Sequence, residues 1–216
     1  EVNADLSYKG NKIPVRIRLK GDRLDHLLGN KWSFRVKVRN KNTFFGMREF
    51  SLQHPRTRNY HNEFIFHELL KYENLPYLRY KFVTLKINGK DYGTYALEEH
   101  FSKQLIENSG FREGPILKLS EDIFWKEIQR SAKIDGSTYS TIPSKINISK
   151  IDLFNSKRTF KIPSQGSQYY LARELLKDFL QKKKNISDVF DINSLATFYA
   201  INDLLQAHHA GQPRNI

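Results

Sequence analysis

Basic residues recur at every second position in two stretches of the amino-acid sequence. The first stretch carries Arg16, Arg18 and Lys20, and the second carries Arg35 and Lys37. Alternation with a period of two places these side chains on one face of an extended strand. Like charges this close repel one another unless an anion or carboxylates lie among them. The pattern therefore predicts either a binding surface for phosphate groups or the solvated outer face of a half-buried sheet.

Two adjacent carboxylates, Glu98 and Glu99, precede His100 at the end of another alternating stretch. Successive side chains of a strand point to opposite faces, so only one of the two carboxylates can face a shared cleft. A carboxylate there can pair with a strand lysine or meet a nucleotide, and it can equally be a surface acid beside basic neighbours. The sequence leaves open which of the two faces the cleft.

Cysteine and histidine residues do not indicate a metal site. The sequence contains no cysteine, which excludes disulfide partners and thiolate metal ligands. His208 and His209 are adjacent, whereas two metal ligands on one helix need a spacing of about four residues. The remaining histidines show no ligand spacing either, so we do not expect a zinc site.

The charge of the chain favours anionic partners. Its 216 residues carry a formal net charge of +13, which suits nucleic acid, phosphate esters, acidic peptides or an anionic membrane surface. An ordinary solvated basic surface would have the same composition. No run of about 18 apolar residues is present, so no transmembrane segment is expected. No nucleic-acid reader motif is recognisable, so nucleic acid is not the partner that we expect.

The elements that position these residues change from strands to helices along the chain. Alternating apolar residues predict strands at residues 13–20, 32–39, 49–53, 82–87, 92–97 and 115–119. Asn88-Gly89 predicts a tight hairpin turn between two of these strands. Helices are expected at residues 60–73, 102–108, 121–132, 168–184 and 192–206. This order predicts an α+β protein with a sheet-rich lobe followed by the start of a helical lobe.

We expect three regions along the chain. Residues 1–132 form the sheet-rich lobe, residues 133–165 form a polar insertion or inter-lobe segment, and residues 166–216 begin the helical lobe. The chain starts at Glu1 rather than at Met, and its last residues carry no terminal signature. We therefore expect a fragment of a longer protein.

Four motifs in order carry a resemblance to a known family. They are Arg18-Leu19-Lys20-Gly21-Asp22, residues 31–37 (Lys-Trp-Ser-Phe-Arg-Val-Lys), residues 45–55 (from Phe-Gly to His-Pro), and residues 87–101 (from Ile-Asn-Gly to Glu-Glu-His-Phe). Their order and spacing resemble the CotH kinase family of atypical protein kinases, which is named for a spore-coat protein. The resemblance covers residues 10–119 and returns more weakly at residues 194–216.

The resemblance implies a protein-kinase-like fold that binds ATP with Mg²⁺ or Mn²⁺ and phosphorylates Ser or Thr of a protein substrate. The candidate nucleotide-binding residues are Lys31, Arg35, Lys37, Arg18, Glu98 and Glu99. Family members are often linked to the cell surface or the spore coat. The resemblance therefore implies a bacterial protein that is extracytoplasmic or associated with the cell envelope.

The C-terminal end of the chain departs from the family pattern. The family has an Asp after a helix of small and apolar residues, and an Asn about five residues later. Placing residues 200–205 on that helix puts His209 at the Asp position and Asn215 near the Asn, with one extra residue between them. His209 can serve as a general base and Asn215 as a metal ligand, or His209 can mark lost activity. The family's second essential Asp would follow Ile216, so we expect the fragment itself to be inactive.

Three functions fit these observations. The first is a kinase that transfers phosphate from ATP. The second is a pseudokinase or binding module that docks acidic protein or cell-envelope ligands through the basic sheet face. The third is a nucleic-acid-binding protein, which the charge and the aromatic content of the chain suggest but no motif supports.

Overall fold

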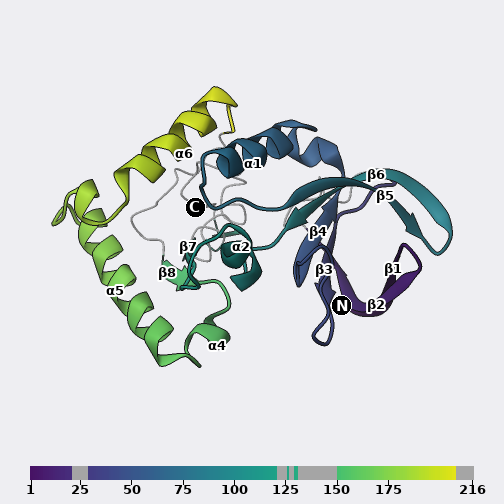
Figure 1. Ribbon diagram of the computed structural model, residues 1–216, viewed down its shortest axis with the longest axis horizontal. Helices are drawn as coiled ribbons and strands as arrows, with labels where there is room; N and C mark the ends of the chain where they lie inside the picture. Colours follow the sequence, from purple (N-terminus) through teal and green to yellow (C-terminus); the bar gives the residue numbers. More distant parts are fainter. Residues whose placement is uncertain (21–28, 121–125, 127–128, 131–149, 208–216) are drawn as a thin grey trace. The chain divides into compact units, whose positions relative to one another are not determined.

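The computed structural model describes residues 1–20, 29–120, 126, 129–130 and 150–207 of the chain (Figure 1). The protein is a mixed α+β chain with a curled, six-stranded antiparallel sheet followed by C-terminal helices. It divides into two compact units, Glu1–Glu113 and Gly114–Ile216. The predicted helix after Ser120 and the start of the predicted insertion at residue 133 lie largely outside the described residues.

The sheet of the first unit has the strand order β1-β2-β3-β4-β6-β5. Its strands are β1 (Val2–Tyr8), β2 (Asn11–Leu19), β3 (Phe34–Val38), β4 (Glu49–Gln53), β5 (Tyr80–Ile87) and β6 (Lys90–Glu99). Every neighbouring pair is antiparallel, and short turns connect β1 to β2 and β5 to β6. The strands predicted in this part of the sequence are confirmed, whereas β1 was not predicted.

One face of the sheet holds the apolar core of the first unit. The strand alternation brings together its buried members Val15, Val36, Val38, Phe50, Leu52, Tyr95 and Leu97, and Phe44 and Met47 join them from the connection between β3 and β4. Strands with one apolar and one polar face bury the apolar side and leave the other for solvent or ligands. The sheet curls in Figure 1, and its opposite face carries the basic residues of β2 and β3.

The β5–β6 hairpin turns at Asn88 and Gly89, as the sequence predicts. Both residues have positive φ values, of 50° and 81°, which is the geometry that Asn-Gly adopts at low cost in a two-residue hairpin. The turn pairs Ile87 with Lys90, and a register shift between Thr84 and Lys86 then places Tyr80 of β5 opposite Glu98 of β6. That register matters for the site because it sets the neighbours of the Glu98 carboxylate.

Two helices complete the first unit. Helix α1 (Asn62–Tyr72) confirms the predicted helix and buries Phe66, His67 and Leu70. The helix contacts β5 through His67, which stacks on Tyr80 with ring centroids 6.2 Å apart. A single helical turn, η2 (Pro55–Arg58), connects β4 to this region, and the short α2 (Lys103–Asn108) follows β6. Helix α1 therefore covers the face of the sheet to which Tyr80 belongs.

The second unit pairs a short two-stranded sheet with helices. Strand β7 (Leu117–Ser120) is antiparallel to β8 (Lys150–Leu153). Three helices follow, α4 (Ser156–Thr159), α5 (Pro163–Leu180) and α6 (Ile192–Leu204), with a turn of 3-10 helix at Ile186–Asp188 between the last two. The Asp191 carboxylate caps α6 by accepting from the backbone N–H groups of Asn193 and Ser194. Among the described residues, no helix is long and apolar enough to cross a membrane.

Candidate functional site

Basic side chains of β2 and β3 lie side by side on one face of the sheet. In the strand register, Arg16 is opposite Lys37 and Arg18 is opposite Arg35. Lys20 follows directly after β2 and continues the same alternation. The two basic stretches therefore pair, and their cations share one face.

A carboxylate lies among these cations. Glu49 of β4 is opposite Lys37. Its oxygens lie 3.6 Å from Arg35 Nη1 and 3.4 Å from Lys37 Nζ. The Lys37 side chain is 55% exposed and the Arg35 side chain only 15%. Glu49 therefore offsets part of the repulsion between the cations. Of Arg35 and Lys37, Arg35 is the less exposed to solvent.

Glu98 of β6 is the centre of a buried ionic cluster. Its oxygens lie 3.4 Å from Lys20 Nζ and 3.5 Å from Arg58 Nε. The Gln53 amide donates to Glu98 Oε2, and Lys20 Nζ donates to Gln53 Oε1 at 2.9 Å. We call these four residues the Glu98 cluster. It joins the end of β2, β4, the η2 turn and β6 at one place on the basic face.

The charges in the Glu98 cluster shift one another's protonation. Burial alone would raise the pKa of Glu98, but Lys20 and Arg58 hold that pKa well below its ordinary value. Burial lowers the pKa of Lys20, against the opposing charge of Glu98. For Arg58, burial lowers the pKa, but the combined pull of Glu98, Glu63 and Tyr80 outweighs it, so the pKa is raised. One ionised carboxylate therefore faces two cationic side chains, so the cluster carries a net positive charge that a further anion would balance.

Arg35 has a hydrogen-bond donor that the described residues do not use. Its Nε is buried and has no hydrogen-bond partner among them. Burial and the neighbouring Arg18 lower the pKa of Arg35, against the opposing charges of Glu49 and Glu98. A buried donor without a partner costs about 1–3 kcal/mol. A phosphate oxygen at this place would satisfy that donor.

His100 does not add a further positive charge to the face at neutral pH. Burial lowers its pKa to about 3, together with the charges of Arg35 and Lys20. Its Nε2 lies 3.9 Å from Glu49, which by itself would favour the protonated form. However, Glu49 already contacts Arg35 and Lys37, and burial together with the cationic neighbours keeps the pKa of His100 low.

Glu99 lies on the opposite face from Glu98, because successive side chains of β6 alternate. Its side chain is fully buried and forms an ion pair with Arg79. The same guanidinium donates to the carbonyl oxygens of Phe45 at 3.0 Å and Gly46 at 3.3 Å. Glu99 therefore anchors the turn at Phe45 and Gly46 to the core, whereas Glu98 is the carboxylate that meets the strand lysine.

The remaining candidates lie at different places. Arg18 is opposite Arg35 on the basic face, and its guanidinium donates to the Leu19 carbonyl at 3.3 Å. Lys31 precedes β3 and reaches β6, where its Nζ donates to the Thr94 carbonyl at 3.3 Å and lies 5.9 Å from the Tyr95 ring centroid. The roles of Arg18 and Lys31 in nucleotide binding stay predictions.

Metal ligation finds little support in this part of the chain. The described residues contain no group of three or more His, Asp or Glu side chains that could hold a metal ion. Glu98 is already engaged by Lys20, Arg58 and Gln53. The predicted catalytic His209 and the predicted metal ligand Asn215 lie outside the described residues, and their roles stay predictions.

The basic sheet face therefore carries a buried lysine–glutamate pair. Residues 15–215 match the family described as CotH kinase protein. The chain belongs to the CotH kinase family. Membership implies ATP as the phosphate donor and a phosphate acceptor as substrate. No curated protein matches the chain.

Three members of the Glu98 cluster were not among the residues predicted to bind the nucleotide. The alternation with Arg16 and Arg18 places Lys20 on the basic face, whereas no sequence pattern indicates Gln53 or Arg58. Their positions depend on β4 pairing with β6, which the sequence order does not reveal. The sequence feature that indicates this cluster is Lys20 itself, because it is the last cation of the alternating stretch that begins at Arg16.

Proposed function

We propose that the chain is the nucleotide-binding part of an ATP-dependent protein kinase, with the phosphates of ATP lying against the basic face of the sheet. The observation that supports this best is the buried ion pair of Lys20 and Glu98, 3.4 Å apart, next to Arg35. Phosphoryl transfer needs positive charge over the transferred group, and kinases commonly hold a lysine there with a glutamate. Family membership is the reason to expect ATP rather than another phosphate ester.

Glu98 acts in this proposal as a positioning residue. An ammonium group has three N–H donors. Among the described residues, Lys20 Nζ donates to two acceptors, Gln53 Oε1 and Glu98 Oε1. The third N–H can therefore meet a phosphate oxygen, with Arg35 Nε as a second donor. Fixed donors of this kind stabilise charge without reorganising during the reaction.

ATP would supply the γ-phosphoryl group, which passes to a Ser or Thr hydroxyl of a protein substrate. Asn215 would help to hold Mg²⁺ or Mn²⁺, and His209 would accept the hydroxyl proton. Neutral imidazole can accept a proton near pH 7, so a histidine at this position is compatible with general-base catalysis. A protein-kinase-like lobe arrangement and a location outside the cytoplasm belong to the same proposal.

The direct test is the melting temperature of the chain with ATP and Mn²⁺. A ligand at a hundred times its Kd stabilises by about 2.7 kcal/mol, which raises the melting temperature by about 5 °C or more. Lys20→Met should abolish the ATP-dependent shift. Lys12→Gln removes a cation from the same strand, further from Glu98 by its register, and should retain the shift. No shift in the wild-type chain contradicts the proposal.

Catalysis requires a separate measurement. Labelled γ-phosphate should pass from ATP to a protein acceptor when the full-length protein is used, and the His209→Ala variant should transfer it at least about a hundredfold more slowly. An unchanged rate in that variant would refute His209 as the base. ATP binding without any transfer would favour a pseudokinase.

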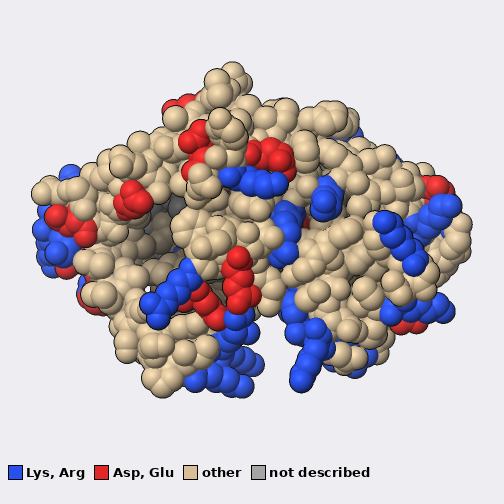
Figure 2. Space-filling view, in the orientation of Figure 1, with Lys and Arg blue, Asp and Glu red and all other residues tan. Residues whose placement is uncertain are grey.

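A second candidate function rests on the exposed end of the basic face. Arg16 and Lys37 are opposite each other, with side chains 53% and 55% exposed. Figure 2 shows Lys and Arg side chains in many places on the visible surface, and Asp and Glu gathered in fewer. Such a face suits an acidic protein or envelope polymer. Binding of an acidic polymer that is lost in Arg16→Gln, without any response to ATP, would favour this function.

A further inference from the structure

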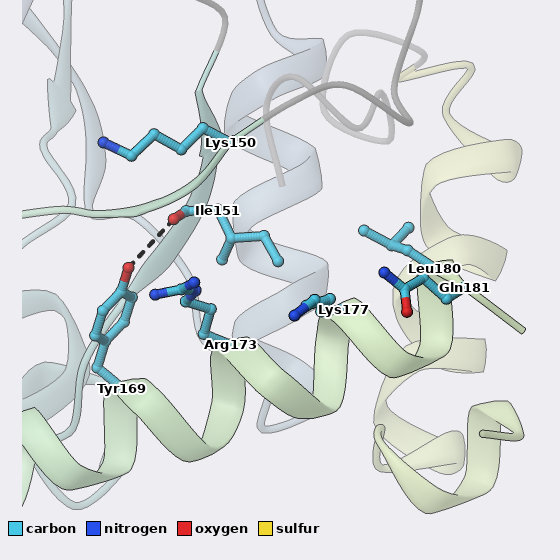
Figure 3. A pocket seen from close by; sticks show the side chains of 7 residues that line it. All are labelled: Lys150, Ile151, Tyr169, Arg173, Lys177, Leu180 and Gln181. Carbon is cyan, nitrogen blue, oxygen red and sulfur yellow. Dashed lines mark hydrogen bonds between the residues drawn. The ribbon is translucent and has the colours of Figure 1, made fainter. Parts of the chain in front are cut away.

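The second unit contains a pocket that the proposed kinase site does not use. It has a volume of about 540 Å³, within the usual range for ligand sites of about 300–1,000 Å³. Strand β8 and helix α5 supply its lining, which consists of Lys150, Ile151, Tyr169, Arg173, Lys177, Leu180 and Gln181. Figure 3 shows this pocket from close by. Three of its side chains are cationic, and none is acidic.

The lining follows from the period of α5. Tyr169, Arg173 and Lys177 are spaced four residues apart, so they lie on one face of the helix, one turn after another. Figure 3 shows all three extending from α5 on the side of β8. The Tyr169 hydroxyl donates to the Ile151 carbonyl at 3.2 Å. This hydrogen bond joins α5 to β8 at one end of the pocket, and Arg173 and Lys177 follow from there along α5.

The two cations of α5 are weakly held by the protein itself. Arg173 Nε lies 3.8 Å from Glu174, and Lys177 Nζ lies 3.4 Å from the other oxygen of the same residue. All three side chains are at least 42% exposed. Ion pairs this exposed are worth about 0–1 kcal/mol. A better anion can therefore replace Glu174 at little cost.

The spacing of the cations suits an extended peptide. Four residues of helix rise about 6 Å between Arg173 and Lys177. Side chains at alternate positions of an extended strand lie about 6.6 Å apart on one face. Carboxylates at alternate positions would therefore meet one cation each. Ile151, Leu180 and the Tyr169 ring supply apolar surface between them.

We propose that this α5–β8 pocket binds an acidic peptide segment of a protein, extended along α5 with Asp or Glu at alternate positions. A peptide with separate carboxylates fits better than a single phosphate, because the cations are arranged in a row rather than around one point. The proposal does not depend on ATP binding. In a working kinase, the pocket would hold a substrate or a regulatory segment.

The test is fluorescence polarisation of a labelled peptide with Glu at alternate positions, using the whole chain without ATP. A peptide with Gln at the same positions should bind about tenfold more weakly, since two exposed ion pairs together contribute about 1–2 kcal/mol. Raising the salt from about 0.1 M to 1 M shortens the Debye length from about 10 Å to 3 Å and should abolish binding.

Variants separate this pocket from the general charge of the chain. The double variant Arg173→Gln and Lys177→Gln should bind the acidic peptide about tenfold more weakly. The double variant Lys157→Gln and Lys161→Gln removes the same charge from exposed positions outside the pocket and should change affinity less than twofold.

The exchange Arg173→Lys with Lys177→Arg keeps both charges, so it should retain binding even if the neutral variant folds poorly. Equal affinity for the Glu and Gln peptides, equal losses in the two neutral double variants, or loss of binding in the exchanged variant would overturn the proposal. Preference for anionic vesicles or nucleic acid over the peptide would also overturn it. Because ATP is absent, each of these failures leaves the proposed kinase function untouched.

Discussion

Replacing Glu98 by Gln tests the buried cluster on which the candidate site depends. Glutamine has nearly the same shape and can still accept the hydrogen bond from Gln53. It removes the one negative charge that Lys20 and Arg58 share, and their side chains are only 13% and 18% exposed. Removing one partner of a buried ion pair costs about 3–5 kcal/mol. We therefore expect Glu98→Gln to lower the free energy of unfolding by about 3 kcal/mol.

The assay is urea denaturation followed by circular dichroism, with Glu107→Gln as the control. Glu107 pairs with Lys103 across the surface of α2, and its side chain is 48% exposed. That variant should lose at most about 1 kcal/mol. The pKa of Glu98 lies below its ordinary value of 4.5, so its contribution is complete above pH 4.5 and decreases as the pH falls further. A loss below about 1 kcal/mol for Glu98→Gln, or a loss equal to that of the control, would refute the cluster.

Two further perturbations test other parts of the first unit. The pKa of His100 is lowered from 6.5 to about 3, so unfolding takes up a proton between these pH values. The free energy of unfolding of the wild-type chain should therefore fall by about 1.4 kcal/mol per pH unit below pH 6.5. In pH-dependent urea titrations, His100→Gln should make that fall less steep. Gly46→Ala places a Cβ against Arg79 at a φ of +78°, whereas Gly10→Ala has a φ of +80° and open space. Both should lose about 1 kcal/mol from backbone strain, and Gly46→Ala should lose at least about 1 kcal/mol more in thermal melts. Equal losses would show that the Arg79 anchor is not rigid.

Elements with strong local signals could be predicted from the sequence. Asn88-Gly89 specifies its turn by backbone preference alone, and Asp191 specifies the start of α6 by capping. Strand β1 has no comparable signal. It lies at the edge of the sheet, with Val2 66% exposed, and its turn to β2 uses Lys9 and Gly10, with φ values of 48° and 80°. An edge strand gains stability mainly from pairing, which a local pattern does not contain.

The candidate site could be predicted only where alternation along one strand was sufficient. The shared face of Arg18 and Arg35 follows from alternation once β2 and β3 are paired. The choice between Glu98 and Glu99 needed the register of β6 against β4, which places Glu98 with Ser51 and Glu99 with Phe50. Long-range register is set by packing of the apolar face and not by the polar residues that it brings together.

Titration calorimetry of ATP against the Arg35→Gln variant tests the proposed site most directly. The buried Nε of Arg35, which lacks a partner among the described residues, should donate to a phosphate oxygen. A hydrogen bond to a charged group contributes about 1.5–3 kcal/mol. Arg35→Gln should therefore bind ATP at least about tenfold more weakly than the wild-type chain, while Lys12→Gln binds within about twofold. Equal ATP affinity in wild type and Arg35→Gln would contradict a nucleotide site on this face of the sheet.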